Sequence, residues 1–122
     1  MKPLLKTELD SFNDRFCNFV DAELRNVDIT SPTTMLVKVA TQDKNKEFDW
    51  ITLELEFNGV SDAKLIDDSK LSLVDMGEGA NIINEDNYFG FCIGNYKNIS
   101  SLKNSLLYII SSNLKYEIKP YN

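Results

Sequence analysis

The residues of this chain that could do chemistry are carboxylates. Asp and Glu number 19 against 13 Lys and Arg, and the chain has no histidine. It therefore lacks the side chain that most often serves as a general base or a metal ligand near neutral pH. Glu54 and Glu56 are two residues apart in a strand-like pattern, so their carboxylates should share one face at about 7 Å. Such a pair could perform acid–base chemistry of the glycosidase kind, or it could be a solvated face.

The other candidate nucleophiles and metal ligands lack supporting partners. Cys17 and Cys92 lie far apart and outside any CxxC motif. Reactive cysteines need an electropositive, partly open setting, whereas Cys92 lies in an apolar stretch, so we expect both thiols to be reduced and buried. Acidic pairs between residues 67 and 86 offer oxygen ligands, but their spacing is not that of a calcium-binding loop. We predict no catalytic residue, no metal and no cofactor.

Negative charge is concentrated in the middle of the chain. The segment 49–86 contains ten acids and two lysines, a net charge of −8, while the whole chain carries −6. This asymmetry predicts a surface suited to a basic partner. It argues against direct binding to nucleic acid, because phosphate contacts draw on clustered Lys and Arg, and these are scattered singly here.

Hydrophobic periodicity indicates the elements that must carry these residues. Spacings of three and four among Leu5, Leu9, Phe12 and Phe16 predict a helix over 3–17. Alternation of period two then predicts strands at 21–30, 34–41, 50–57, 60–66, 71–74, 88–93, 105–111 and 113–118.

The connections between these strands also carry signals. Asn58-Gly59 is typical of a tight turn, and the stretch 77–87 is polar and predicts a loop. The stretch 95–104 is expected to be a loop, although helical spacing after residue 99 leaves a helix open there.

The pattern as a whole predicts one domain over 1–122, of the α+β class and mainly β. A short N-terminal helix should pack on an antiparallel sheet or sandwich of about six to seven short strands. The longest apolar run, 106–110, is five residues, and the N-terminus has no apolar signal-peptide core. We therefore expect a cytoplasmic protein with no membrane span.

Three segments resemble small immunity proteins of bacterial contact-dependent and polymorphic toxin systems. They read FVDAEL at 19–24, LELEFNGV at 53–60 and LYIISSNLKYEI at 107–118. The resemblance implies a cytoplasmic inhibitor that binds a cognate toxin domain, often a basic nuclease, and blocks its active site or substrate groove.

An acidic surface with an aromatic anchor is the predicted contact with such a partner. A tryptophan beside carboxylates has the composition of a binding hot spot, the alternative being that Trp50 lies in the core. The candidate contact residues are Asp49, Trp50, Glu54, Glu56, Asp62, Asp67 and Asp68.

Two other functions remain open at this stage. The domain could bind a small ligand or metal, or act as a carboxylate-dependent enzyme, in a cavity of the sheet. It could also be an adaptor that self-associates through its strand edges. The sequence does not define the oligomeric state.

Overall fold

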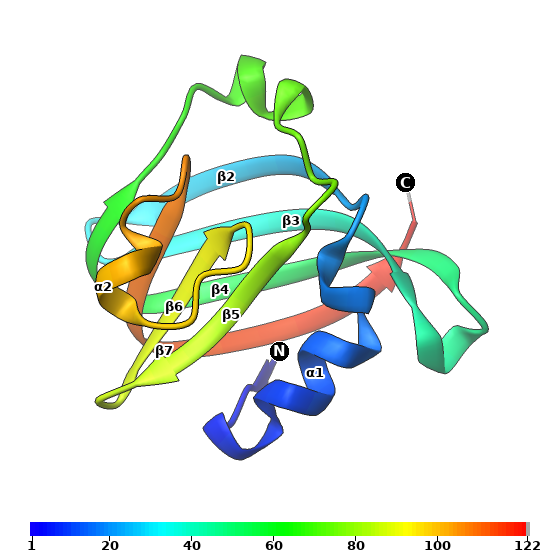
Figure 1. The fold of residues 1–122 in the computed structure, drawn as a ribbon, viewed down its shortest axis with the longest axis horizontal. Helices are drawn as coiled ribbons and strands as arrows, with labels where there is room; N and C mark the ends of the chain where they lie inside the picture. The colour runs from blue at the N-terminus through cyan, green and yellow to red at the C-terminus, as the bar shows by residue number, and fades with distance from the viewer. Residues whose placement is uncertain (122) are drawn as a thin grey trace.

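Two long strands organise the molecule. In the computed structural model, which describes residues 1–121, β4 (Asp49–Lys64) pairs antiparallel with β7 (Tyr108–Pro120) over almost the full length of both. The strand order is β2-β3-β4-β7-β6-β5, and the short β1 also pairs with β7. The other strands are β1 (Lys2–Pro3), β2 (Glu23–Ser31), β3 (Thr34–Asp43), β5 (Ala80–Glu85) and β6 (Tyr88–Ile93). The predicted class, mainly antiparallel β with a short helix, is confirmed (Figure 1).

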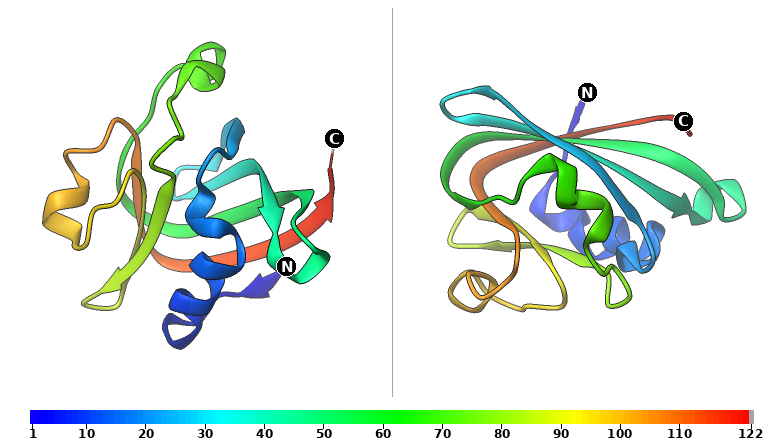
Figure 2. Two further views of the ribbon diagram at one scale, coloured as in Figure 1. Left: turned by 45° about the vertical axis from the view of Figure 1, so that its right-hand side comes forward. Right: turned by 90° about the horizontal axis from the view of Figure 1, so that it is seen from above.

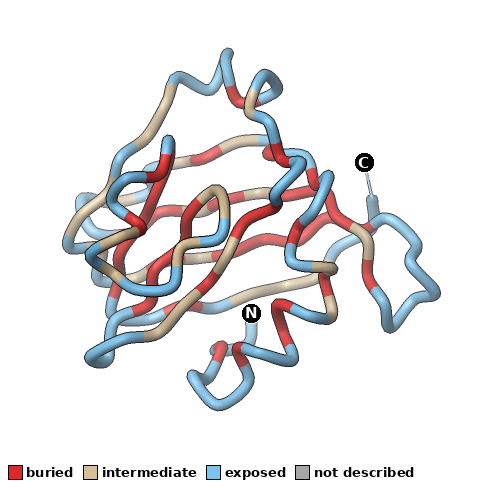
Figure 3. Tube along the Cα trace, in the orientation of Figure 1, coloured by how far each residue is buried: buried red, intermediate tan, exposed pale blue. Residues whose placement is uncertain are grey.

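The sheet bends so that its two halves face each other across the core. One layer contains β2, β3 and β4, and the β5–β6 hairpin lies in the other, with the helix α1 (Leu9–Arg15) between them (Figure 2). The alternating residues of β4 that face this core are fully or almost fully buried: Ile51, Leu53, Leu55 and Phe57. Figure 3 shows the buried positions running along the central strands.

The predicted N-terminal helix is present but divided. A 3-10 turn, η1 (Lys6–Glu8), precedes α1, and a second, η2 (Cys17–Phe19), follows it. Phe12 and Phe16 are buried as their spacing predicts, but Leu5 is 55% exposed and Leu4 is buried in its place. The chain enters the helix from β1, whose pairing with β7 turns Leu4 rather than Leu5 toward the core.

The predicted turn at Asn58-Gly59 is wrong, because both residues lie inside β4. Gly59 has φ +68°, and a Cβ at this position would collide with the Ser112 hydroxyl of β7. The glycine therefore permits a kink rather than a reversal. Beyond it, Val60 and Ala63 pack on the core. The strands predicted at 50–57 and 60–66 are thus one strand, as are those predicted at 105–111 and 113–118.

Three further differences lie in the connections. The strand predicted at 71–74 is a 3-10 helix, η4 (Asp68–Leu73), which packs on β2 and buries only Leu71. The polar stretch 77–87 contains β5, and a short helix, α2 (Ile99–Leu102), lies within the predicted loop 95–104. A 3-10 turn, η3 (Lys44–Lys46), joins β3 to β4. Within residues 1–121, no helix is long and apolar enough to cross a membrane.

The outer edge of β5 is closed by a side chain of α1. The buried amide of Asn13 donates to the Ile82 carbonyl (2.9 Å) and accepts from the Ile82 N–H (3.4 Å). It thus occupies both backbone groups that a further strand would use at this position. An edge strand closed in this way is a poor template for pairing with another chain.

Removing this amide should destabilise the fold. We expect Asn13→Leu to lower the free energy of unfolding by about 1–3 kcal/mol, because the Ile82 N–H and carbonyl are left buried without partners. Asp10→Ala, an exposed change on the same helix, should stay within about 0.5 kcal/mol. Urea unfolding of the three proteins measures this, and equal midpoints for wild type and Asn13→Leu would contradict the assignment.

Candidate functional site

The structure places the seven predicted contact residues in three separate regions. Trp50, Glu54 and Glu56 alternate with the buried residues of β4 and so lie on the outer face of the sheet, and Asp49 is the first residue of that strand. Asp62 lies beyond the kink, and the pair 67–68 begins η4. These residues therefore do not form one continuous acidic patch.

Glu54 is not a free acidic contact. Its side chain is almost buried, and its carboxylate lies 3.3 Å from the Lys119 Nζ of β7 and 4.0 Å from the Lys38 Nζ of β3. Hydrogen bonding to Glu54 and its negative charge raise the pKa of Lys119. The outer face of the sheet is therefore balanced in charge at its centre rather than acidic.

Two further predicted acids, Asp62 and Glu56, have local partners within the fold. Asp62 accepts a hydrogen bond from the Tyr108 hydroxyl (3.2 Å) and lies 3.5 Å from the Lys103 Nζ. Glu56 accepts from the Asn58 amide (3.0 Å).

Asp67 caps η4 by accepting from the Ser69 N–H (3.0 Å) and hydroxyl (2.9 Å), and these bonds lower the pKa of Asp67. Asp49 and Asp68 are exposed, and neither forms an ion pair within the described part of the chain.

Trp50 pairs with a second aromatic ring, which an arginine also contacts. The Trp50 side chain is 38% exposed, and its ring lies 6.0 Å from that of Tyr121, which follows β7 and is 49% exposed. The Arg25 guanidinium lies 5.5 Å from the Tyr121 ring centroid and donates to its hydroxyl (3.2 Å). Glu23 fixes the same guanidinium at 3.0 Å. We call Trp50, Tyr121 and Arg25 the outer-face cluster.

Two members of this cluster were not predicted from the sequence. Arg25 reaches Tyr121 from the bulge that separates Leu24 from Asn26 in β2. The sequence indicates a bulge or change of face after Leu24, and a hairpin of β2 with β3, but not the strand order that brings the end of β7 within reach of Arg25. Tyr121 becomes a neighbour of Trp50 because β7 pairs with β4 up to Pro120.

The two cysteines are free thiols. Cys92 is buried beneath α2, and burial raises the pKa of its thiol, which disfavours the nucleophilic thiolate. Cys17 is half-buried, which corrects the expectation that both would be buried. Among residues 1–121, no three acidic or cysteine side chains come together as a group that could hold a metal ion.

The most buried charge of the fold is Asp43, at the end of β3. Its carboxylate is fully buried and accepts two hydrogen bonds from Arg15 of α1, Nε at 2.9 Å and Nη2 at 3.0 Å. It also accepts from the Asn45 N–H (2.9 Å) and so caps η3. This group joins three elements and has a structural role.

No protein-family model matches this chain, and no curated protein or solved structure is detectably similar to it.

The Asp43–Arg15 pair makes the stability of the fold depend on pH in the acidic range. Burial alone would raise the pKa of Asp43, but the hydrogen bonds from Arg15 and Asn45 and the charges of Arg15 and Lys46 together lower it below its ordinary 3.8. The stabilisation is therefore complete above the unfolded-state pKa and is lost as the pH falls through the lower folded-state pKa.

We expect Asp43→Asn to lower the free energy of unfolding at pH 7 by about 2 kcal/mol. This loss is smaller than that for breaking a fully buried ion pair, because Arg15 is partly exposed. The difference from wild type should shrink as the pH falls below 3.8. Asp14→Asn, which alters an exposed pair with Lys44, is the control. Urea unfolding between pH 3 and 7 measures the effect, and a difference independent of pH would contradict it.

Proposed function

We propose that this protein is a cytoplasmic immunity protein that binds and neutralises a cognate bacterial toxin domain with the outer face of its sheet. The observation that carries the proposal is the outer-face cluster. Trp, Tyr and Arg are the residue types that dominate the energy of protein–protein interfaces. Here one of each lies exposed, and Tyr121 contacts both Trp50 and Arg25.

The cluster is preorganised for binding. Tyr121 is held between the Trp50 ring and the Arg25 guanidinium, and Arg25 is held in turn by Glu23. Beneath it, β4 is flanked by β3 and β7, and its inward side chains are buried in the core. A partner can therefore bind with little ordering of side chains, which reduces the entropic cost of association.

The net negative charge of the protein favours a basic partner, because opposite charges attract over long range. The net charge of −6 and the exposed carboxylates of Asp49 and Asp68 give the field that accelerates the approach of a basic domain. Glu54 acts indirectly, because it positions Lys38 and Lys119 within the fold. A basic nuclease domain fits this field, and inhibition follows from physical occlusion of its active site or substrate groove.

Truncating the tryptophan should abolish most of the binding. We expect Trp50→Ala to weaken affinity for the toxin partner by about 30- to 1000-fold, as for a central hot-spot residue. Tyr88→Ala, which removes a ring that is 44% exposed on β6, should change it less than about threefold. The partner is isolated with the tagged protein, and binding and protection of growth on co-expression are then measured. Full protection by Trp50→Ala would contradict the proposal, as would a partner that is harmless when expressed alone.

Reversing the charge of two exposed acids should slow association with the partner. We expect Asp49→Lys with Asp68→Lys to slow association about tenfold at low salt and to flatten its dependence on salt, with dissociation little changed. Asp10→Lys with Glu78→Lys, two exposed acids elsewhere, changes the net charge by the same amount and is the matched control. Glu54→Lys is unsuitable because it would bring a third cation beside Lys38 and Lys119. Stopped-flow association at several salt concentrations tests this, and an unchanged rate would exclude steering by these two acids.

A further inference from the structure

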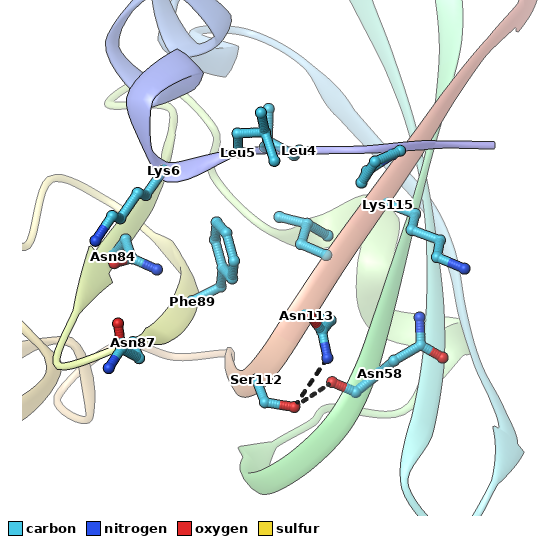
Figure 4. A pocket seen from close by; sticks show the side chains of 12 residues that line it. Leu4, Leu5, Lys6, Asn58, Asn84, Asn87, Phe89, Ser112, Asn113 and Lys115 are labelled. Carbon is cyan, nitrogen blue, oxygen red and sulfur yellow. Dashed lines mark hydrogen bonds between the residues drawn. The ribbon is translucent and has the colours of Figure 1, made fainter.

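A cavity of about 460 Å³ lies beside β7, between the N-terminal segment and the β5–β6 hairpin (Figure 4). At its base, the Ser112 hydroxyl donates to the Asn58 carbonyl (3.3 Å) and accepts from the Asn113 amide (3.3 Å). Figure 4 shows the Lys115 amine directed away from the cavity. These polar groups are used within the fold or lie turned outward, so the stronger evidence for binding is at another place, the end of the β3–β4 hairpin.

The end of this hairpin carries aromatic residues that alternate with acids. Residues 47–50 read EFDW, and all four are exposed, with Phe48 at 51%. The hairpin end lies at the same end of the molecule as the C-terminus, where Tyr121 joins Trp50 (Figures 1 and 2). A single exposed phenylalanine is ordinary on a protein surface. The backbone of Phe48 is not ordinary, and it supplies the further observation.

Phe48 has a left-handed backbone conformation. Its φ is +66°, and that of Glu47 is +55°. This region is disfavoured for residues with a Cβ, most of all for bulky ones, and glycine or asparagine normally occupies it in turns. A glycine at position 48 would therefore form the same hairpin at lower cost. Strained residues concentrate at functional sites, so the presence of a phenylalanine indicates that its ring has a use outside the turn.

Hydrogen bonds on both sides of the residue hold this conformation. The Phe48 N–H donates to the Asp43 carbonyl (3.0 Å), and the Gln42 amide donates to the Phe48 carbonyl (3.2 Å). Gln42 lies directly opposite Trp50 in the register of β3 with β4, so the two side chains share the outer face of the sheet. Phe48 is thus fixed at the end of that face, two residues before Trp50.

The charges around the ring favour a basic partner. The carboxylates of Glu47 and Asp49 flank it in the chain, and neither forms an ion pair within residues 1–121. The two lysines of η3 interact with acids of the fold instead. Lys44 pairs with a carboxylate of α1 at 3.0 Å, and the positive charge of Lys46 contributes to lowering the pKa of Asp43. A ring between two free carboxylates fits an apolar pocket with a basic rim.

We propose that Phe48 is a second aromatic anchor of the partner-binding surface, and that its ring fills an apolar pocket of the toxin domain rimmed by lysine or arginine side chains. The fixed backbone presents the ring before the partner arrives, which lowers the entropic cost of binding. This inference rests on the proposed function. It extends the contact surface from the outer-face cluster to the end of the β3–β4 hairpin.

Two truncations of Phe48 test the backbone strain without any partner. Phe48→Ala and Phe48→Gly both remove the ring, but only glycine adopts a positive φ without strain. We therefore expect Phe48→Gly to unfold at a higher urea concentration than Phe48→Ala. Equal midpoints, or a lower midpoint for the glycine variant, would overturn the strained conformation and the inference drawn from it.

Affinity for the partner tests the anchor. The probe is the protein that copurifies with the wild-type chain and is toxic when expressed alone. We expect both truncations to weaken its binding by about tenfold or more, and Phe48→Tyr, which keeps the ring, to change it less than about threefold. Tyr88→Ala, which removes an exposed ring at the end of another hairpin, is the matched control and should also change it less than about threefold.

Trp50→Ala, measured alongside, separates this inference from the proposed function. Loss of binding in Trp50→Ala but not in the Phe48 truncations would overturn the second anchor and leave the proposed function intact. Full binding by all three variants, or a partner without toxicity, would contradict the proposed function and the anchor with it.

Reversing one flanking charge tests the basic rim of the pocket. We expect Glu47→Lys to weaken binding by about tenfold, whereas Glu78→Lys, an exposed acid before β5, should change it less than about threefold. Equal effects of the two reversals would overturn the basic rim.

Discussion

The pairing of β4 with β7 is the interaction on which the rest of the structure depends. Both strands are long enough to belong to both halves of the bent sheet, so each apolar side chain on their inner faces packs against the opposite half. The kink at Gly59 and the register shift between Val60 and Asp62 let the pair turn while the pairing continues to Lys64. Because these two strands run through both halves of the sheet, the core between the layers depends on their ladder.

The same ladder positions the surface to which we assign partner binding. The inner face of β4 is fully covered, so its outer side chains stand on a rigid support, and Trp50 is brought beside Tyr121 at the end of β7. On its other side, β7 pairs with β6 and with β1 over two separate stretches.

Local pattern in the sequence predicted most of the elements, because alternation of apolar residues directly reports a half-buried strand. The prediction failed where the same local sequence signal occurs in two kinds of structure. Asn58-Gly59 permits positive φ in a reversal and in a kink alike, and only the pairing with β7 decides between them. Leu71 and Leu73 alternate as in a strand but belong to a 3-10 helix that buries only the first.

The candidate surface was predictable in composition but not in geometry. Trp50 is exposed, as a contact residue must be. Whether Glu54 is free or paired depends on Lys38 and Lys119, which reach it from two neighbouring strands, and the sequence does not reveal that proximity. Cross-strand neighbours follow from strand order, which is a property of the whole fold.

The central claim is that a protein partner covers the outer-face cluster, and the chain offers a direct probe because Trp50 is its only tryptophan. Protein labelled with 5-fluorotryptophan gives one fluorine resonance, which can be followed as the unlabelled toxin partner is added. The account predicts a new resonance for the complex that is shielded from a soluble paramagnetic agent. A resonance whose position and accessibility stay unchanged at saturating partner would contradict it.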